Sequence, residues 1–348
     1  MRWFTVAAIF AAFWSVSTAD WDFSRNMHSH NDYERNLPLF DGLASGVKSF
    51  EADLHLVHAG RYSWSFTDLA VSHKRPGFRG HQSFKSLYLD PLEALFDHAN
   101  SGNASVEPFS DLYGNIPSTS LQLLREDRSL HLLLDYKDRD ASIVHSFLIN
   151  YLSHLRSRNL LTTYDAVTGK LTPRPITIVC SGSCRLEDVL AQQPRDVFFD
   201  APLDKLDQFE HGPEVAPLAS ASLTILFGNV GSTNLNEGRM KKIRPMLENA
   251  YSRGIQTRLY DNPTWPSCVR NAVLKKLKQS GVYWMNVDDL RAGVRVDDRP
   301  ESCIGIHLCR LWLSFQILMP TAIGLWGIRW ILDARRRVKL MRMVQRNQ

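Results

Sequence analysis

Short apolar runs rich in β-forming residues recur along the chain, and many are followed by a pattern typical of an amphipathic helix. Eight runs are predicted to be strands: 25–28, 47–57, 130–135, 176–180, 197–200, 222–226, 256–260 and 283–287. Helices are predicted at 41–44, 141–157, 185–191, 241–253 and 266–280. Strands alternating with helices over about 270 residues indicate an α/β fold, most simply a closed (β/α)8 TIM barrel. A doubly wound sheet is the alternative, but no Gly-rich phosphate loop follows the first strand.

One insertion of over seventy residues interrupts this rhythm between the second and third predicted strands. Its first part, RYSWSFTDLAVSH, is expected to fold back as a strand that ends at His73. SLYLDPLEAL is typical of a turn followed by a helix, and the Asn/Ser/Gly-rich stretch after it of an exposed loop. That loop contains one glycosylation sequon at Asn103, so we expect a glycan there if the loop is lumenal.

The N-terminal end has the pattern of a secretory signal peptide. Arg2 precedes an apolar run, and small residues come before a cut after Ala19, so residues 1–19 are predicted to be removed. An uncleaved membrane anchor is the alternative. An apolar start with a single basic residue does not resemble a mitochondrial transit peptide, which favours the secretory pathway over mitochondria.

The C-terminal end has the pattern of a membrane anchor. Residues 311–328 carry no charge, and a cluster of arginines follows them directly. This predicts a linker at 299–310, a transmembrane helix at 311–330 and a basic cytosolic tail at 331–348. A buried core helix is the alternative. The barrel itself, residues 20–298, is then expected on the lumenal or extracellular side of a single-pass membrane protein.

Composition and charge add little beyond this. Apolar residues make up 44% and charged residues 22% of the chain, as in an ordinary globular protein. The tail after residue 332 has six Lys or Arg and one Asp, so it carries the whole net charge of +5 and the rest of the chain is neutral. The body therefore shows no sign of a nucleic-acid-binding surface. Of five cysteines, Cys180 and Cys184 are placed to close a small loop, and Cys268 is placed to pair with Cys303, although sequence alone does not fix connectivity.

Candidate chemistry lies at the carboxyl ends of the first three predicted parallel strands, the edge where TIM barrels carry their active sites. The first strand ends at His28, the second carries Glu51 and Asp53, and the third ends in Asp135 with Lys137 beyond it. Glu51 and Asp53 alternate along a strand and share one face. Three converging carboxylates require a cation, so the pattern predicts a Mg²⁺ site, with Ca²⁺ as the other hard cation that fits. The alternative is a set of ion-paired carboxylates at a barrel rim.

The sequence His28-Ser29-His30 also permits a second interpretation, a zinc amidohydrolase site. That site needs further histidines on later strands and an aspartate on the last, for which Asp288 or Asp289 is available. The ends of the fifth and sixth predicted strands read FFDAP and LTILFG and contain no histidine. The zinc interpretation therefore lacks half of its ligands.

A family resemblance accounts for more of these residues. HSHNDYERNLPLFDGLASGVKSFEADLHLV, SLYLDPL, LLLDYKD and NVDDL resemble the fungal altered inheritance of mitochondria protein 6 family, within the phospholipase-C-like phosphodiesterases that include glycerophosphodiester phosphodiesterases and sphingomyelinase D-like phospholipases. The resemblance covers residues 22–296.

This resemblance implies a metal-dependent phosphodiester hydrolase acting on a glycerophosphodiester or a phospholipid-type substrate. His28 and His73 would be the acid–base pair, and Lys137 would face the phosphate. The metal would be held by Glu51, Asp53 and Asp135, while His30, Asn31 and Asp32 would support the site from behind. A catalytically inactive barrel that serves as a binding or scaffold protein is the remaining alternative.

Three positions depart from the family pattern. Ser72 and Lys74 flank His73 where a glycine and an acidic residue are expected, and Tyr260 stands where a tryptophan is expected. These departures bear on substrate preference.

Overall fold

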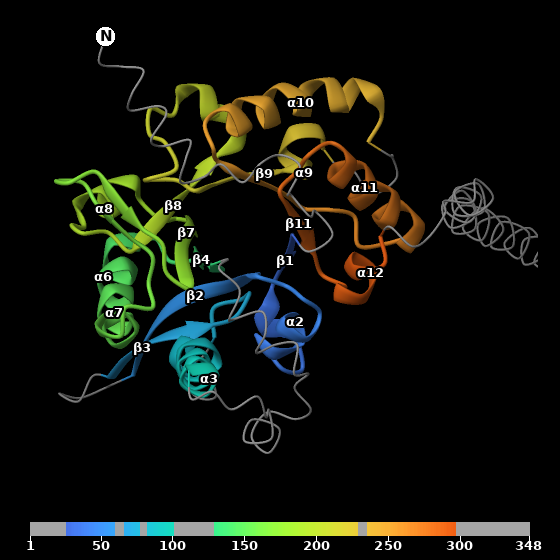
Figure 1. The fold of residues 1–348 in the computed structure, drawn as a ribbon. Coiled ribbons are helices and arrows are strands. Elements are labelled where there is room, and N and C mark those ends of the chain that lie inside the picture. The colour runs from blue at the N-terminus through green and yellow to red at the C-terminus, as the bar shows by residue number, and fades with distance from the viewer. Residues whose placement is uncertain (1–25, 60–65, 77–81, 101–128, 229–234, 297–348) are drawn as a thin grey trace, which may run out of the picture.

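Eight parallel strands form a closed barrel in the computed structural model, which describes residues 26–59, 66–76, 82–100, 129–228 and 235–296 (Figure 1). The order around the barrel is β1-β2-β4-β7-β8-β9-β10-β11, and it closes because β1 pairs with both β11 and β2. These strands are β1 Met27–Ser29, β2 Ser49–Ala59, β4 Leu130–Tyr136, β7 Ile176–Gly182, β8 Val197–Pro202, β9 Leu218–Ser222, β10 Gln256–Tyr260 and β11 Trp284–Val287. The predicted TIM barrel is confirmed.

Helices surround the barrel strands (Figure 1). They are α2 Phe40–Ala44, α3 Asp90–Asn100, α6 Ala141–Tyr151, α7 Ser153–Ser157, α8 Leu186–Ala191, α9 Leu223–Phe227, α10 Glu237–Ser252, α11 Ser267–Gln279 and α12 Leu290–Val294, with short helical turns η3 Asp32–Glu34, η4 Lys85–Leu89 and η5 Leu203–Gln208. The side chain of Asn236 accepts a hydrogen bond from the backbone of Arg239 and begins α10, whose buried residues recur every three or four positions.

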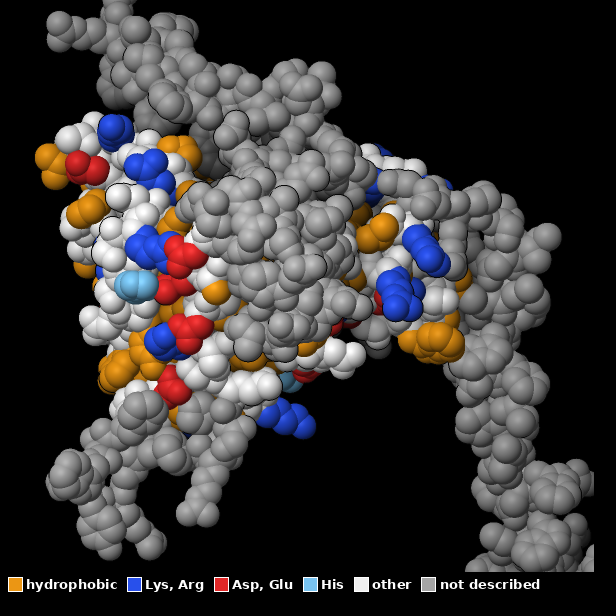
Figure 2. Space-filling view, turned by 60° about the horizontal axis from the view of Figure 1, so that its bottom comes forward, with side chains coloured by type: hydrophobic (Ala, Val, Ile, Leu, Met, Phe, Trp, Pro, Cys, Tyr) orange, Lys and Arg blue, Asp and Glu red, His pale blue; other side chains and the backbone are white. Residues whose placement is uncertain are grey.

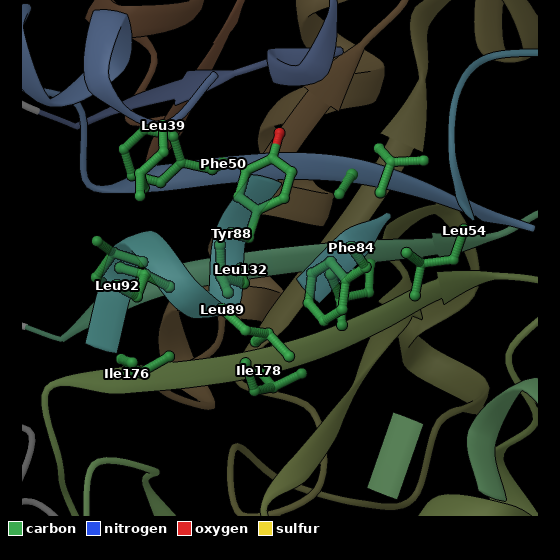
Figure 3. Close-up of a cluster of buried hydrophobic side chains, with 14 of the residues drawn as sticks. Leu39, Phe50, Leu54, Phe84, Tyr88, Leu89, Leu92, Leu132, Ile176 and Ile178 are labelled. Carbon is green, nitrogen blue, oxygen red and sulfur yellow. The ribbon is translucent and has the colours of Figure 1, made fainter. Parts of the chain in front are cut away.

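The insertion folds against the outside of the barrel. β3 (Phe66–Val71) pairs antiparallel with β2, which confirms the predicted returning strand before His73. The turn and helix predicted for SLYLDPLEAL are η4 and α3. Figure 3 shows Tyr88, Leu89 and Leu92 from this insertion in the same buried cluster as Leu132 and Ile178 of the barrel strands. A two-stranded hairpin, β5 (Thr163–Asp165) with β6 (Lys170–Thr172), lies elsewhere.

The barrel interior is filled by a smaller apolar cluster from several strands, namely Leu133, Val179, Phe198, Leu218 and Trp284. Alternate residues on each strand face inward, so the same strands carry polar residues into the barrel on both sides of this cluster. This packing makes the lower part of the barrel a core and leaves the chemistry at its carboxyl edge.

The prediction for the sixth barrel strand was wrong by four residues. The strand is β9, LASAS, whereas the more apolar LTILF that follows it forms α9. All five residues of β9 are buried, and Ala219 and Ala221 pack in the outer apolar cluster, where small side chains fit under the helices. The side chain of Ser222 accepts the backbone N–H of Ile225 and begins the helix.

The disulfide prediction for CSGSC is confirmed, because Cys180 and Cys184 are bonded to each other. The signal peptide, Asn103, Cys303, the linker, the predicted span at 311–330 and the tail lie outside the described residues. Within the described ranges, no helix is both long and apolar enough to cross a membrane. On the face shown in Figure 2, basic and acidic side chains stand next to each other rather than in fields of one sign.

Candidate active site

Three carboxylates meet at the carboxyl edge of neighbouring strands. Glu51 and Asp53 lie on β2, and Asp135 lies opposite Asp53 on β4. One oxygen of each carboxylate lies within 4.8 Å of the others. Glu51 and Asp53 are buried, while Asp135 is only partly covered and faces the opening. The convergence expected from the strand alternation is therefore present.

Lys137 neutralises part of this charge. Its Nζ lies 2.6 Å from Asp135 Oδ2 and 3.0 Å from Asp53 Oδ2. Burial alone would lower the pKa of Lys137, but the two carboxylates raise it above its ordinary value. Burial raises the pKa of Asp135, and the charges of Asp53 and Glu51 add to this, against the opposing effect of Lys137. Asp53 Oδ1 is buried and has no hydrogen-bond donor in the part of the chain that the structure describes.

Asp135 has room only because residue 182 is glycine. Gly182 has a φ of +67°, and a Cβ atom placed on it would lie 1.8 Å from Asp135 Oδ1. It sits inside the Cys180–Cys184 loop, where the backbone N–H of Ser183 donates to the Tyr136 carbonyl. The CSGSC motif therefore shapes the wall beside this carboxylate.

Arg258 on β10 lies at the centre of the polar interior and is 3% exposed. Its Nη1 donates to Glu51 Oε1 at 3.3 Å, to Asn286 Oδ1 at 3.2 Å and to His28 Nε2 at 2.9 Å. Its Nε donates to Ser220 Oγ at 3.1 Å. Burial opposes the charge of Glu51, but Arg258 and the neighbouring histidines hold the Glu51 pKa well below its ordinary value.

The contacts of His28 fix it as a neutral imidazole. Since the guanidinium of Arg258 has only donors, His28 Nε2 must accept, and His28 Nδ1 must then carry the proton that it donates to Ser49 Oγ at 2.7 Å. His28 is fully buried, and burial together with Arg258 lowers its pKa to about 4. With both nitrogens engaged, it has no ring nitrogen free to coordinate zinc, which counts further against the amidohydrolase interpretation.

His30 has different surroundings although it follows two residues later. Its Nδ1 lies 2.6 Å from Asp288 Oδ1, and its Nε2 lies 3.5 Å from Glu51 Oε2. Burial opposes protonation, but the hydrogen bond to Asp288 and the charge of Glu51 raise the His30 pKa above its ordinary value. Its side chain is 23% exposed. Asp289, the second carboxylate of NVDD, instead caps α12 by accepting the N–H of Ala292.

Of the other predicted site residues, His73 and Asn31 contact the carboxylate cluster, whereas Asp32 does not. His73 Nδ1 lies 3.3 Å from Asp53 Oδ2, and its side chain is 59% exposed. Asn31 adopts a left-handed backbone (φ 47°) and its N–H donates to Glu51 Oε2 at 3.3 Å. Asp32 is fully buried and accepts from Ser29 Oγ, from the backbone N–H of Leu39 and from the Tyr88 hydroxyl. Asp32 therefore fixes the shape of the loop after β1 and does not reach the carboxylate cluster.

Sequence reasoning missed four polar residues of the interior, namely Arg258, Ser220, Asn286 and Asp200. Burial raises the pKa of Asp200 to about 7, and its Oδ1 has no hydrogen-bond partner among the described residues. The signal for Arg258 was present in QTRLY, because a charged residue in a strand that is covered by helices must face the barrel interior. Ser220 was missed because the sixth strand was predicted at 222–226, which left Ser220 outside any strand.

Comparison with known proteins identifies the family of this chain. A family model described as the AIM6-like phosphodiesterase domain matches residues 22–200. The chain is similar to altered inheritance of mitochondria protein 6 from Lachancea thermotolerans, with 29% identity over 76% of this chain and 63% of the relative. The protein of the same name from Eremothecium gossypii is 30% identical over 76% of this chain and 68% of its own length, and that from Saccharomyces cerevisiae is 28% identical over the same shares.

The alignment with the first of these relatives spans less than two thirds of that protein. The family match itself covers the segment that carries the three carboxylates, Lys137 and His73. The chain belongs to the AIM6-like phosphodiesterase domain family.

Proposed function

We propose that the protein is a metal-dependent hydrolase of phosphodiesters, with a glycerophosphodiester or phospholipid-type substrate. The observation that carries this proposal is the convergence of Glu51, Asp53 and Asp135 within 4.8 Å at the carboxyl edge of the barrel. Two imidazoles, those of His30 and His73, contact different carboxylates of this cluster. A cation-binding set flanked by two proton-transfer groups matches what phosphodiester cleavage requires.

The carboxylates fit a hard divalent cation. Among the described residues, three negative charges are paired with two Lys or Arg side chains, those of Lys137 and Arg258, so a further positive charge is favoured. The buried Asp53 Oδ1 has no donor among the described residues, which suits a metal ligand. Glu51, Asp53 and Asp135 would hold Mg²⁺, or Ca²⁺, and when bound the ion would neutralise charge on the phosphate oxygens.

We assign proton transfer to His30 and His73, a change from the His28 and His73 pair that the resemblance implies. Asp288 orients His30 through Nδ1, which leaves Nε2 facing the carboxylate cluster. His28 has no free nitrogen, and its contacts instead hold Arg258 against Glu51. One of the two reactive imidazoles takes the proton of the attacking hydroxyl, the other protonates the leaving oxygen, and Lys137 binds a phosphate oxygen.

The predicted signal peptide at 1–19 and the predicted transmembrane helix at 311–330 also lead to a proposal for where the protein is located in the cell. A helix at 311–330 would hold the barrel at a membrane of the secretory pathway, on the lumenal or extracellular side, with Asn103 open to glycosylation. Such a tether would keep the site near lipid-derived phosphodiesters.

A substrate screen with and without metal tests the proposal. The purified protein is incubated with glycerophosphodiesters, lysophospholipids and sphingomyelin, in Mg²⁺ and in chelator. We expect hydrolysis of at least one class, loss of activity in chelator and its return with Mg²⁺. Calorimetry is expected to show Mg²⁺ binding that Asp53→Asn abolishes.

The matched control is Glu248→Gln, which alters an exposed carboxylate in the last turns of α10, toward the start of β10 and the opposite end of the barrel, and should keep both Mg²⁺ binding and hydrolysis. Absence of Mg²⁺ binding together with absence of hydrolysis across the screen would overturn the proposal. The barrel would then serve as a binding or scaffold module.

A further inference from the structure

A cavity of about 360 Å³ lies directly beside the candidate active site. Its walls come from the end of β2, the segment after β3 and the loop between β4 and α6. The lining residues are Leu56, His58, Arg75, Lys137, Asp138, Arg139 and Asp140. Lys137 is shared with the active site, so a group bound over Lys137 can extend into this cavity.

Part of the charge in the cavity is already paired. Arg75 forms an ion pair with Asp138 and donates to the Leu56 carbonyl at 3.0 Å. The backbone N–H of Leu56 donates to the other oxygen of Asp138. These contacts hold the end of β2 and the loop after β4 together, and they form a fixed wall rather than a binding group.

Two opposite charges in the same cavity are left for a ligand. The side chains of Arg139 and Asp140 form no hydrogen bond or ion pair with the rest of the described chain, and both are exposed. His58 uses Nδ1 for Thr67 and has Nε2 free. A cavity lined by one arginine and one aspartate that are both unpaired among the described residues matches a ligand that carries both signs of charge.

We propose that this cavity binds the head group attached to the scissile phosphate, and that this head group is a zwitterionic amino acid of the serine type. The carboxylate would pair with Arg139, whose guanidinium favours planar anions, and the ammonium with Asp140, while the phosphate lies over Lys137. A polyanionic head group is disfavoured because the unpaired carboxylate of Asp140 would repel it. This inference deepens the proposed function and rests on it for the hydrolysed bond, but binding tests it separately.

Two small ligands test the contribution of the amino-acid carboxylate, the group expected to pair with Arg139. O-phospho-L-serine and phosphoethanolamine differ by one carboxylate, and calorimetry with the full chain in Mg²⁺ measures both. We expect phosphoserine to bind about tenfold more tightly, the effect of one charge-assisted hydrogen bond. Arg139→Gln should remove this difference, and Asp140→Asn should weaken both ligands because both carry the ammonium.

The matched control is Arg174→Gln, which changes an exposed arginine just before the start of β7, at the opposite end of the barrel, and should keep the difference. Equal affinity of the two ligands for the unmodified protein would overturn the proposal. So would a preference that survives Arg139→Gln, or tighter binding of glycerol 1,3-bisphosphate than of phosphoserine.

Hydrolysis separates this inference from the proposed function. We expect kcat/KM for glycerophosphoserine to exceed that for glycerophosphoethanolamine by about tenfold, mainly through KM, and Arg139→Gln to remove the preference. Preferential phosphoserine binding without any hydrolysis supports the cavity assignment and rejects the enzyme. If both substrates are hydrolysed with equal kcat/KM, and Arg139→Gln leaves the two values equal, the cavity assignment is rejected and the proposed hydrolase activity stands.

Discussion

His28 on β1 and His30 just after that strand lie two residues apart, yet their partners give them opposite properties. Arg258 occupies Nε2 of His28, and burial with this cation lowers the His28 pKa to about 4. Asp288 binds Nδ1 of His30 and helps to raise the His30 pKa. The two side chains are chemically identical, so the difference between their pKa values comes from their surroundings, chiefly burial and the cation beside His28 and the carboxylates beside His30.

Substitution of the two histidines is expected to separate catalysis from stability. His30→Asn should lower kcat by about 10²–10⁴-fold, the usual contribution of a proton-transfer group, with little change in the free energy of unfolding. His28→Ala should instead lower the free energy of unfolding by about 1–3 kcal/mol, because Ser49 Oγ loses its donor and Arg258 its acceptor. Kinetics and urea unfolding measure the two effects. Full kcat in His30→Asn would reject this assignment.

Arg258→Met is expected to destabilise the fold strongly. Glu51 would remain as a buried carboxylate without its cation, which costs about 3–5 kcal/mol in the free energy of unfolding. The double variant Arg258→Met, Glu51→Gln removes both charges and should recover part of this loss. Urea unfolding in chelator measures both variants, and a loss below about 1 kcal/mol in the single variant would show that Glu51 is not held by Arg258.

At the scale of elements, seven of the eight barrel strands were located from apolar runs, and the sixth was not. β9 consists mostly of small residues with low strand propensity, and it is a strand because it pairs in parallel with β8 on one side and β10 on the other. The carboxylates of Glu51, Asp53 and Asp135 were predictable because they depend only on alternation within a strand and on strand order. The partners of His28 and His30 were not, since they lie 230 and 258 residues away, on β10 and just after β11.

Gly182, the last residue of β7, is expected to determine the position of the Asp135 carboxylate. Gly182→Ala places a methyl group against Asp135 Oδ1, so Asp135 must move, and Mg²⁺ affinity and kcat should both fall at least about tenfold, as when a metal-supporting contact is lost. Gly169→Ala is the matched control, because Gly169 has the same φ of +67° but no atom within 4 Å of the added methyl. Equal losses in both variants would show that backbone strain, rather than contact with Asp135, is responsible.

At the scale of the whole molecule, the barrel interior makes stability depend on pH. His131 is buried against Trp284, its Nδ1 has no partner in the described chain, and burial lowers its pKa to about 4. His28 has a similarly lowered pKa. Between pH 6.5 and about 4 the unfolded chain takes up these protons and the folded chain does not, so these two histidines lower the stability as the pH falls. Asp200 acts in the opposite direction, because its raised pKa of about 7 lets the folded chain bind a proton that the unfolded chain does not.

The slope of this loss is about 1.4 kcal/mol per pH unit for each histidine, and about twice that for both. His131→Leu should therefore reduce the slope of the unfolding free energy by about 1.4 kcal/mol per pH unit between pH 6.5 and 4.5, as measured by urea unfolding at several pH values. His154→Leu, at an exposed position on α7, is the control and should leave it unchanged. Identical slopes in the unmodified protein and His131→Leu would contradict the prediction.

Closure of the barrel by a three-residue first strand has a consequence for how the protein is made. β1 pairs with the last strand as well as with β2, so the site assembles from residue 28 to residue 288. A nascent chain that has emerged only as far as residue 200 already contains all three carboxylates, Lys137 and both reactive histidines. It lacks Arg258 to hold Glu51 and Asp288 to orient His30. The two contacts that position Glu51 and His30 therefore form only after β10 and β11 have been synthesised, late in the production of the chain.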